Sequence, residues 1–335
     1  MVSDAVLNND WHVVTRSQDL QEGKILKARL LGEDLVLWRS SGEAKAWQDR
    51  CPHRGSSFAT GWVKKDNLVC PYHGFMFNNS GQCVHVPAHP DQPPPARSKA
   101  CVKTFHVQER YGVVWVCLGT PQQDVPSWPE WDDPSYRHRF FFGYGHCKSS
   151  APRNLENFID VNHIAYVHGD TLGTPDFAEM GNYKIESKPD GIKVSEIKVW
   201  QYDVDMSGEG EVMSASLDIL RPLTVCLRRG TPNDRMVILF TVTPVDEEEC
   251  IGWKLILFNT PGEVPEAEMN ELSNKVIEQD ITAVESQRPK RLPLDLQAEF
   301  HLPSDRTTIA YRKWLSKLGV TFGTIPVAKN AVSSR

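Results

Sequence analysis

The sequence predicts an α+β protein of two domains, in which a small N-terminal β-domain is followed by a larger domain of antiparallel strands and helices. A chain of 335 residues is too long for one ordinary hydrophobic core. Residues 1–120 contain short β-forming runs separated by turns. The second half contains a block of alternating residues between two helical patterns, which indicates a sheet packed on a long helix.

The strands of the first domain are predicted by short runs rich in apolar and β-branched or aromatic residues. Gly23, Gly32 and the Ser40-Ser41-Gly42 cluster separate several of these runs, and a proline-rich loop over 87–95 interrupts the domain. The expected strands are Trp11–Thr15, Lys24–Leu31, Leu35–Trp38, Ala44–Gln48, Thr104–Glu109 and Gly112–Leu118.

A proline-rich segment over 121–137, with acidic and aromatic residues between the prolines, predicts an extended connector. The expected domains are therefore 1–120 and 138–335. In the second domain, Asn154–His168 has a helical pattern, and Tyr183–Phe258 alternates like several antiparallel strands. A second helix is expected over Pro265–Gln287, ending at Arg288-Pro289.

The composition excludes several classes of protein. A net charge of −6 and a pI near 6.0 leave no basic surplus for binding nucleic acid. The N-terminus lacks a basic region followed by an apolar run, and the longest apolar stretches are shorter than a membrane span. We therefore expect a cytoplasmic protein with no membrane partner. Its eight cysteines are expected to be reduced thiols and metal ligands.

Two cysteine–histidine pairs form the first candidate metal site. Cys51 and His53 are separated by one residue and Cys70 and His73 by two, with sixteen residues between the pairs. Proline and glycine make each surrounding loop a tight turn, so both loops can direct their ligands to one point. The loops read Cys51-Pro52-His53-Arg54-Gly55 and Cys70-Pro71-Tyr72-His73-Gly74.

Two metals compete for this ligand set. A structural zinc ion accepts two Cys and two His in a tetrahedron. A Rieske [2Fe–2S] cluster places two Cys on one iron and two His on the other. Zinc fingers usually pair Cys with Cys and His with His, whereas each loop here supplies one of each, so the pattern favours the Rieske cluster. The remaining cysteines lack paired spacing and are expected to be core or surface thiols: Cys83, Cys101, Cys117, Cys147, Cys226 and Cys250.

A second candidate metal site lies in the first helical pattern. Asn157, Asp160 and His163 recur every three residues and would share one helical face. His168 follows five residues later, about 140° from His163 on a regular helix. A π-turn or a helix break after His163 would bring the two imidazoles together. Otherwise these are polar surface residues of an amphipathic helix.

The late helix offers a carboxylate that could complete this site. Its apolar stripe consists of Met269, Leu272, Val276, Asp280 and Val284. A buried carboxylate needs a cation or a hydrogen-bond network, so Asp280 is the expected third ligand of a two-His, one-carboxylate iron site. Glu278 and Glu285 lie off the stripe and are expected to be solvated.

These motifs resemble those of Rieske non-haem iron oxygenases. The Cys51-x-His53 and Cys70-x-x-His73 loops, with their Arg, Tyr and Gly neighbours, resemble the Rieske signature. The run 157–168 is similar to the mononuclear-iron helix of that family, and 278–289 is similar to the helix with its carboxylate ligand. Residues 303–306 and 310–314 resemble the C-terminus of proteins in the branch that contains vanillate demethylases and cyanobacterial guanidinium-toxin hydroxylases.

The resemblance implies a terminal oxygenase component of the EC 1.14 type. Its fold would be a Rieske [2Fe–2S] β-domain followed by a helix-grip, START/Bet v 1-like catalytic domain. A [2Fe–2S] cluster would be held by Cys51, His53, Cys70 and His73, and a mononuclear Fe(2+) by His163, His168 and Asp280. Electrons from NAD(P)H would come through a separate flavin/iron–sulfur reductase or a ferredoxin, and O2 is the co-substrate. No nicotinamide or flavin fingerprint is evident in the chain, which agrees with an external electron supply.

The resemblance also implies a head-to-tail homotrimer, because the two metals of one chain are too far apart for electron transfer. Asp160 would bridge a cluster histidine, expected to be His73, to the iron ligand His163 of a neighbouring chain. Asn157 would lie near the iron as a weak ligand or a supporting side chain. The expected reaction is hydroxylation or oxidative demethylation of a small organic molecule. The alternatives are a cis-dihydroxylating dioxygenase, a Rieske electron carrier and a zinc-stabilised binding protein.

Overall fold

The computed structural model describes residues 4–202, 210–230, 235–259 and 265–327. The chain divides into two compact units, Met1–Val125 and Pro126–Arg335. The division falls inside the segment 121–137, for which the sequence predicts a connector. No helix within the described ranges is both long and apolar enough to cross a membrane.

The first unit contains a six-stranded antiparallel sheet in the order β1-β10-β9-β4-β3-β2. Each of its strands lies within two residues of a predicted one, so these six predictions are confirmed. The short helices α1 (Ala5–Asn8) and η1 (Ser17–Asp19) flank the first strand. The strands are β1 (His12–Arg16), β2 (Ile25–Leu30), β3 (Glu33–Ser40), β4 (Glu43–Gln48), β9 (Thr104–Arg110) and β10 (Val113–Cys117).

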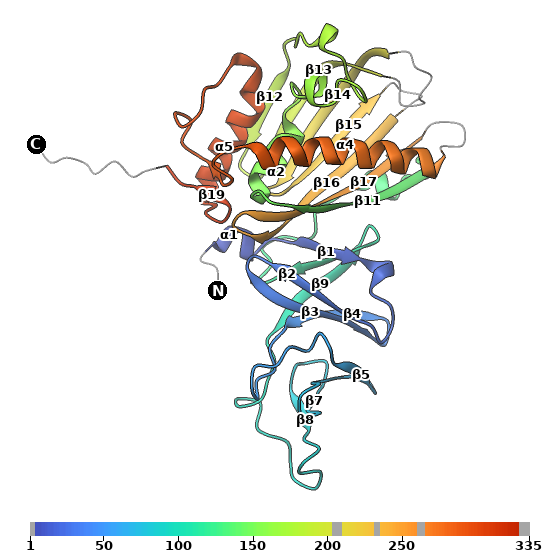
Figure 1. The fold of residues 1–335 in the computed structure, drawn as a ribbon, viewed down its shortest axis with the longest axis vertical. Helices are drawn as coiled ribbons and strands as arrows, with labels where there is room; N and C mark the ends of the chain where they lie inside the picture. Colours follow the sequence, from blue (N-terminus) through green and yellow to red (C-terminus); the bar gives the residue numbers. More distant parts are fainter. Residues whose placement is uncertain (1–3, 203–209, 231–234, 260–264, 328–335) are drawn as a thin grey trace, which may run out of the picture. The chain divides into compact units, whose positions relative to one another are not determined.

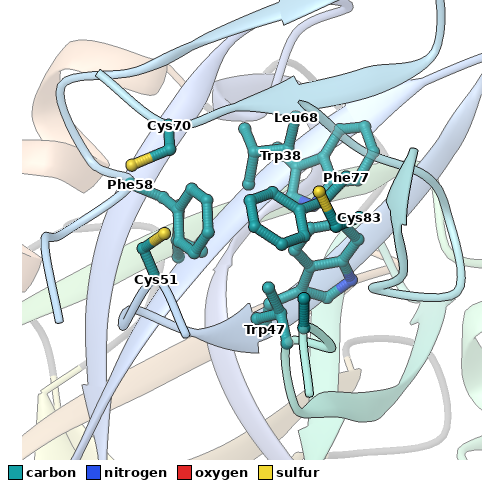
Figure 2. Packing of buried hydrophobic residues seen from close by; sticks show 11 residues of the cluster. Trp38, Trp47, Cys51, Phe58, Leu68, Cys70, Phe77 and Cys83 are labelled. Carbon is teal, nitrogen blue, oxygen red and sulfur yellow. The ribbon is translucent and has the colours of Figure 1, made fainter. Parts of the chain in front are cut away.

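A second, four-stranded sheet in this unit was not predicted. It consists of β5 (Trp62–Lys64), β6 (Asn67–Val69), β7 (Met76–Phe77) and β8 (Cys83–His85). Strands of two or three residues are too short to show a period-two alternation in the sequence. Buried aromatic rings hold this sheet in place: Trp38 and Trp47 pack edge to face at 4.9 Å, and Phe58 and Phe77 do so at 5.5 Å (Figure 2).

The second unit is built on a seven-stranded antiparallel sheet in the order β11-β17-β16-β15-β14-β13-β12. The long helix α4 (Glu266–Ser286) lies across this sheet together with α2 (Ala151–Ile159) (Figure 1). The predicted antiparallel sheet packed on a long helix is confirmed. Both ends of α4 lie one residue inside the predicted range Pro265–Gln287. The strands are β11 (His138–Cys147), β12 (Lys184–Lys188), β13 (Gly191–Tyr202), β14 (Gly210–Arg221), β15 (Thr224–Gly230), β16 (Arg235–Asp246) and β17 (Glu249–Phe258).

The prediction of one continuous helix over Asn154–His168 is wrong. Helix α2 ends at Ile159, the next residue Asp160 has an extended backbone at φ −80° and ψ 108°, and α3 (Ile164–Val167) is a separate single turn. The Asp160 carboxylate accepts a hydrogen bond from the backbone N–H of Asn162 at 2.9 Å, and such local bonds compete with helix formation. Asn157, Asp160 and His163 therefore do not share one helical face, and the break lies before His163 instead of after it.

The remaining elements are short, apart from one C-terminal helix, α5 (Arg306–Leu318), that the sequence analysis did not predict. Its Arg312 is buried and binds both carboxylate oxygens of Glu156 on α2 at 2.5 and 2.6 Å, and also Glu299 at 2.5 Å. These ion pairs fix α2, and with it the start of the segment that carries the histidines. The short elements are η2 (Pro129–Trp131), η3 (Pro175–Phe177), η4 (Pro303–Asp305), β18 (Leu292–Pro293) and β19 (Thr324–Ile325).

Replacing Arg312 with Met should lower the free energy of unfolding by about 3–5 kcal/mol, because the buried Glu156 would lose both hydrogen bonds to a cation and keep only Arg153 at 3.9 Å. Lys313 lies exposed on the same helix, so Lys313→Met should change the stability by less than about 0.5 kcal/mol. Urea unfolding followed by circular dichroism measures both values. Equal effects of the two substitutions would contradict the importance of the buried pair.

Candidate metal centres

The two cysteine–histidine loops have the same backbone structure. In the first loop the N–H of Cys51 donates to the carbonyl five residues later at 2.8 Å, and Gly55 donates back to Cys51 at 2.8 Å. In the second, Cys70 and Gly74 make the corresponding bonds at 2.9 and 3.0 Å. Both glycines have left-handed backbones, with φ of 75° and 70°, which favour glycine at these turns. The structure therefore contains two equivalent jaws.

The jaws hold their cysteines inward and their histidines outward. Cys51 and Cys70 are each 2% exposed and belong to the aromatic cluster of the first unit (Figure 2). Burial and the neighbouring Cys70 thiol raise the pKa of Cys51 to about 12. His53 and His73 are exposed, and their ring centroids lie 4.7 Å apart. The four side chains thus form a buried sulfur pair and an exposed imidazole pair.

This donor set fits a two-iron cluster better than a single ion. A thiol with a raised pKa becomes a thiolate only beside a strong positive charge, and both metals would supply one. A zinc ion, however, needs four ligand atoms around one point. Among the described residues, the group with three or more His, Cys, Asp or Glu ligand atoms around one point consists of other side chains: His163, His168 and Asp280.

That second group is assembled from three places in the chain. His163 and His168 flank the single turn α3, one before its first residue and one after its last. Asp280 comes from the buried stripe of α4. Its Oδ1 lies 3.5 Å from His163 Nε2 and 3.1 Å from His168 Nε2, and the two rings are 5.1 Å apart. A single helical turn with a histidine at each end therefore brings the two imidazoles together, for which a π-turn or a helix break after His163 was expected.

Hydrogen bonds at the opposite ring nitrogens indicate which tautomers the histidines adopt. His168 Nδ1 lies 2.8 Å from Gln279 Oε1, and His163 Nδ1 contacts the backbone carbonyl of Asp160. Both partners are acceptors, so each Nδ1 donates and each neutral Nε2 presents a lone pair. The two lone pairs then converge on Asp280 Oδ1. Three electron-rich atoms at one point repel one another unless a cation lies among them, so the site fits a metal ion.

The protonation states also suit a metal. Burial would by itself raise the pKa of Asp280, but its contacts with His168 and His163 and the positive charge of Lys254 outweigh burial and lower it. Burial lowers the pKa of His163, against the opposing effect of Asp280. At neutral pH the site therefore holds an ionised carboxylate beside neutral imidazole, which are the forms that coordinate metals.

Asn157 and Asp160 occupy different positions around this group. Asn157 Nδ2 donates to Asp280 Oδ1 at 2.8 Å, so it supports the carboxylate. Asp160 contacts His163 through its backbone carbonyl, while its side chain accepts from Asn162. Burial raises the pKa of the Asp160 carboxyl, and the nearby His163 opposes this.

Gln279 was missed as a functional residue by the sequence analysis. Its Oε1 accepts from His168 Nδ1 and from Thr171 Oγ1 at 3.0 Å, while its Nε2 donates to Asp170 at 2.7 Å. All three bonds agree with one orientation of the amide. Gln279 lies off the apolar stripe of α4, so periodicity offered no signal for it, and only its position next to Asp280 could have raised the question.

The three converging side chains line a cavity of about 660 Å³ in the second unit. Its other walls come from the sheet between β13 and β17, from α4 and from residues around α3. Most of these walls are apolar, including Leu217, Ile238, Ile256, Leu272 and Val276. The cavity therefore lies between the sheet and the apolar face of α4 near Leu272 and Val276. A volume of this size suits a small organic molecule.

Comparisons with known proteins agree with the paired loops of the first unit and with the candidate metal site of the second. Residues 10–106 match the Rieske [2Fe-2S] domain, and residues 147–321 match the vanillate O-demethylase oxygenase C-terminal domain. The methylxanthine N1-demethylase NdmA of Pseudomonas putida is 30% identical over 323 residues, covering 93% of this chain and 89% of that protein. The oxygenase component of dicamba O-demethylase from Stenotrophomonas maltophilia is 35% identical over 179 residues, or 52% and 51% of the two chains. The solved structure of NdmA superimposes with a TM-score of 0.79 at 27% identity, over 92% of this chain and 90% of that one.

The fold, the paired loops and these matches define a terminal oxygenase component with a Rieske domain and a mononuclear iron domain. Within that class, the chain belongs to the vanillate O-demethylase oxygenase family. It is accordingly an oxidoreductase that uses O2, with a Rieske [2Fe–2S] cluster and a mononuclear iron as cofactors and NAD(P)H-linked electrons from a separate reductase.

Replacing Gln279 with Leu should weaken iron binding at the second site on the order of 10–100-fold, because His168 would lose the acceptor that fixes its tautomer and ring orientation. Titration of the holoenzyme with a ferrous chelator measures this affinity, and the visible spectrum of the cluster should stay the same. The neighbouring Glu278 is exposed, so Glu278→Gln is the matched control. Iron loss at the same chelator concentration in both variants would rule out the orienting effect.

Proposed function

We propose that His163, His168 and Asp280 hold Fe(II) at the wall of the 660 Å³ cavity, and that the chain hydroxylates or oxidatively demethylates a small organic molecule bound there. The observation that carries this proposal is the convergence of two imidazole lone pairs and an ionised carboxylate at the edge of an apolar pocket. Three protein ligands of this kind leave coordination positions for oxygen.

We assign the cluster to Cys51, His53, Cys70 and His73, in the two equivalent jaws. When bound, the cluster supplies single electrons and the iron activates O2. The protein's own contribution is to orient the metal ligands and to exclude water from the substrate. Asn157 and Gln279 orient Asp280 and His168, while the apolar walls keep water away from the reacting part of the substrate.

Cis-dihydroxylation is the second candidate, because the same iron site serves both reactions. The names of the relatives favour monooxygenation: they include N-demethylases, an O-demethylase and a toluene-4-sulfonate monooxygenase subunit. A substrate screen with a surrogate reductase separates the two by product mass. One added oxygen atom or a lost methyl group supports monooxygenation, and two added oxygen atoms support dihydroxylation.

The electron donor is proposed to be a separate flavin/iron–sulfur reductase or a ferredoxin. The oxidoreductase NdmD of Pseudomonas putida is 41% identical over 115 residues, which are 34% of this chain and 19% of that protein. The proposed working assembly is a head-to-tail homotrimer in the cytoplasm. The domain bounds 1–120 and 138–335, with a connector over 121–137, stay a prediction.

Replacing Asp280 with Ala should lower the iron content from about three atoms per chain to about two, because only the mononuclear site loses a ligand. The EPR signal of the reduced cluster should remain. Glu278→Ala, an exposed change on the same helix, should leave three atoms. An unchanged iron count in the Asp280 variant would show that another carboxylate is the ligand, and a colourless zinc-containing protein would refute the oxygenase assignment altogether.

Replacing Asp160 with Asn should keep both metals but slow turnover on the order of 100-fold, if its carboxylate bridges two histidines across a subunit boundary. The isosteric amide can still accept from Asn162, so the local turn should survive. Asp176→Asn changes an exposed carboxylate of the same unit and serves as the control. Turnover is measured as oxygen uptake with a surrogate reductase, and wild-type rates in the Asp160 variant would exclude the bridge.

A further inference from the structure

The sheet face that lines the cavity carries two cations in a mostly apolar surface. Arg229 on β15 pairs with Met236 and Lys254 on β17 pairs with Phe240. Met236 and Phe240 are four residues apart on β16, so all four side chains lie on the same face. Gln201 on β13 also lines the cavity, and Arg229 Nη1 donates to its Oε1.

Lys254 is buried, with 6% of its surface exposed. No side chain in the described part of the chain accepts a hydrogen bond from its ammonium group or forms an ion pair with it within 4 Å. Burial lowers the pKa of Lys254; Asp280 opposes this shift, and the positive charge of Arg229 adds to it. A buried ammonium group of this kind is costly unless an anion reaches it.

The acidic side chains around the cavity do not supply that anion. Asp280 acts on Lys254, but it already accepts from Asn157 and is assigned to the metal. Asp170, Glu268 and Glu271 are exposed, and Asp170 pairs with Lys275 at 2.9 Å. Once Asp280 coordinates a divalent metal, the cavity interior has an excess of positive charge.

We propose that Lys254 and Arg229, with Gln201 beside them, form a subsite for the acid group of the substrate, a carboxylate or sulfonate on an apolar body. The inference rests on the assignment of this cavity as the substrate site. The apolar walls would hold the body, and the two cations would make charge-assisted hydrogen bonds with the acid oxygens. A guanidinium or ammonium substrate would instead meet two like charges.

The relatives leave this question open, because methylxanthines and toluene-4-sulfonate, which their names give as substrates, differ in charge. The subsite therefore follows from side chains of this chain. It also predicts where the substrate is held: its acid group lies on the sheet side of the cavity, between Arg229 and Lys254, and its apolar body extends along the remaining wall.

The test compares matched acid and neutral probes by calorimetric titration of the holoenzyme without O2, so that binding is read without turnover. The probes are 3-methoxybenzoate with 3-methoxybenzamide, and toluene-4-sulfonate with toluene-4-sulfonamide. At least one acid should bind about 10-fold tighter than its amide. Lys254→Met should weaken binding of that acid about 10–100-fold and leave the amide unchanged, whereas Lys254→Arg should retain most of the affinity.

Lys275→Met is the matched control, because Lys275 also lines the cavity but is exposed at its rim and should alter binding less than about twofold. Iron content and cluster EPR are measured in every variant and should match the wild type. The two acid probes separate a carboxylate subsite from a sulfonate subsite.

Any of three results would overturn the subsite: neither acid binds, acid and amide bind equally, or 3-methoxybenzylguanidine binds more tightly than both. Loss of iron in Lys254→Met would also overturn it, because Lys254 would then belong to the metal centre. Failure of the proposed function itself would be seen separately, as a wild-type protein without mononuclear iron.

Discussion

The convergence of His163, His168 and Asp280 is the interaction around which the second unit is organised. An ionised carboxylate inside an apolar cavity, facing two imidazole lone pairs, would be stabilised by a cation among them. Several other features follow from this requirement. The chain leaves its helix at Asp160 so that a single turn can carry both histidines, and α4 turns its buried stripe toward them. The ion pairs between α2 and α5 then hold the start of this segment in place.

The two candidate metal centres are assembled from the sequence in different ways. The paired loops are local: each jaw closes with hydrogen bonds across four or five residues, and the second repeats the first. The mononuclear site joins residues more than a hundred positions apart, and its supporting bonds from Asn157 and Gln279 are equally distant in sequence. A local motif is readable from spacing alone, whereas a long-range site depends on how helices and sheet pack.

This difference explains what could be predicted. The six longer strands of the first unit, the antiparallel block and α4 have clear periodicities, and Asp280 was recognisable because it interrupts an apolar stripe. The four short strands after Gly61 carry no periodic signal, and α5 begins immediately after a proline turn. The break at Asp160 depends on one side-chain hydrogen bond to Asn162, which outweighed a favourable helical pattern. Gln279 and Lys254 became visible only once tertiary contacts defined their surroundings.

The long helix α4 has two functions along one rigid rod, and this bears on how the enzyme's specificity can evolve. Leu272 and Val276 line the cavity about two turns and one turn before Asp280, respectively. A change in their size therefore risks tilting the helix and displacing the carboxylate. The cavity residues Leu217 and Ile238 lie on strands of the sheet, which carry none of the three converging side chains. Substitutions that admit new substrates are therefore expected on the sheet, while α4 is constrained by the need to keep Asp280 in place.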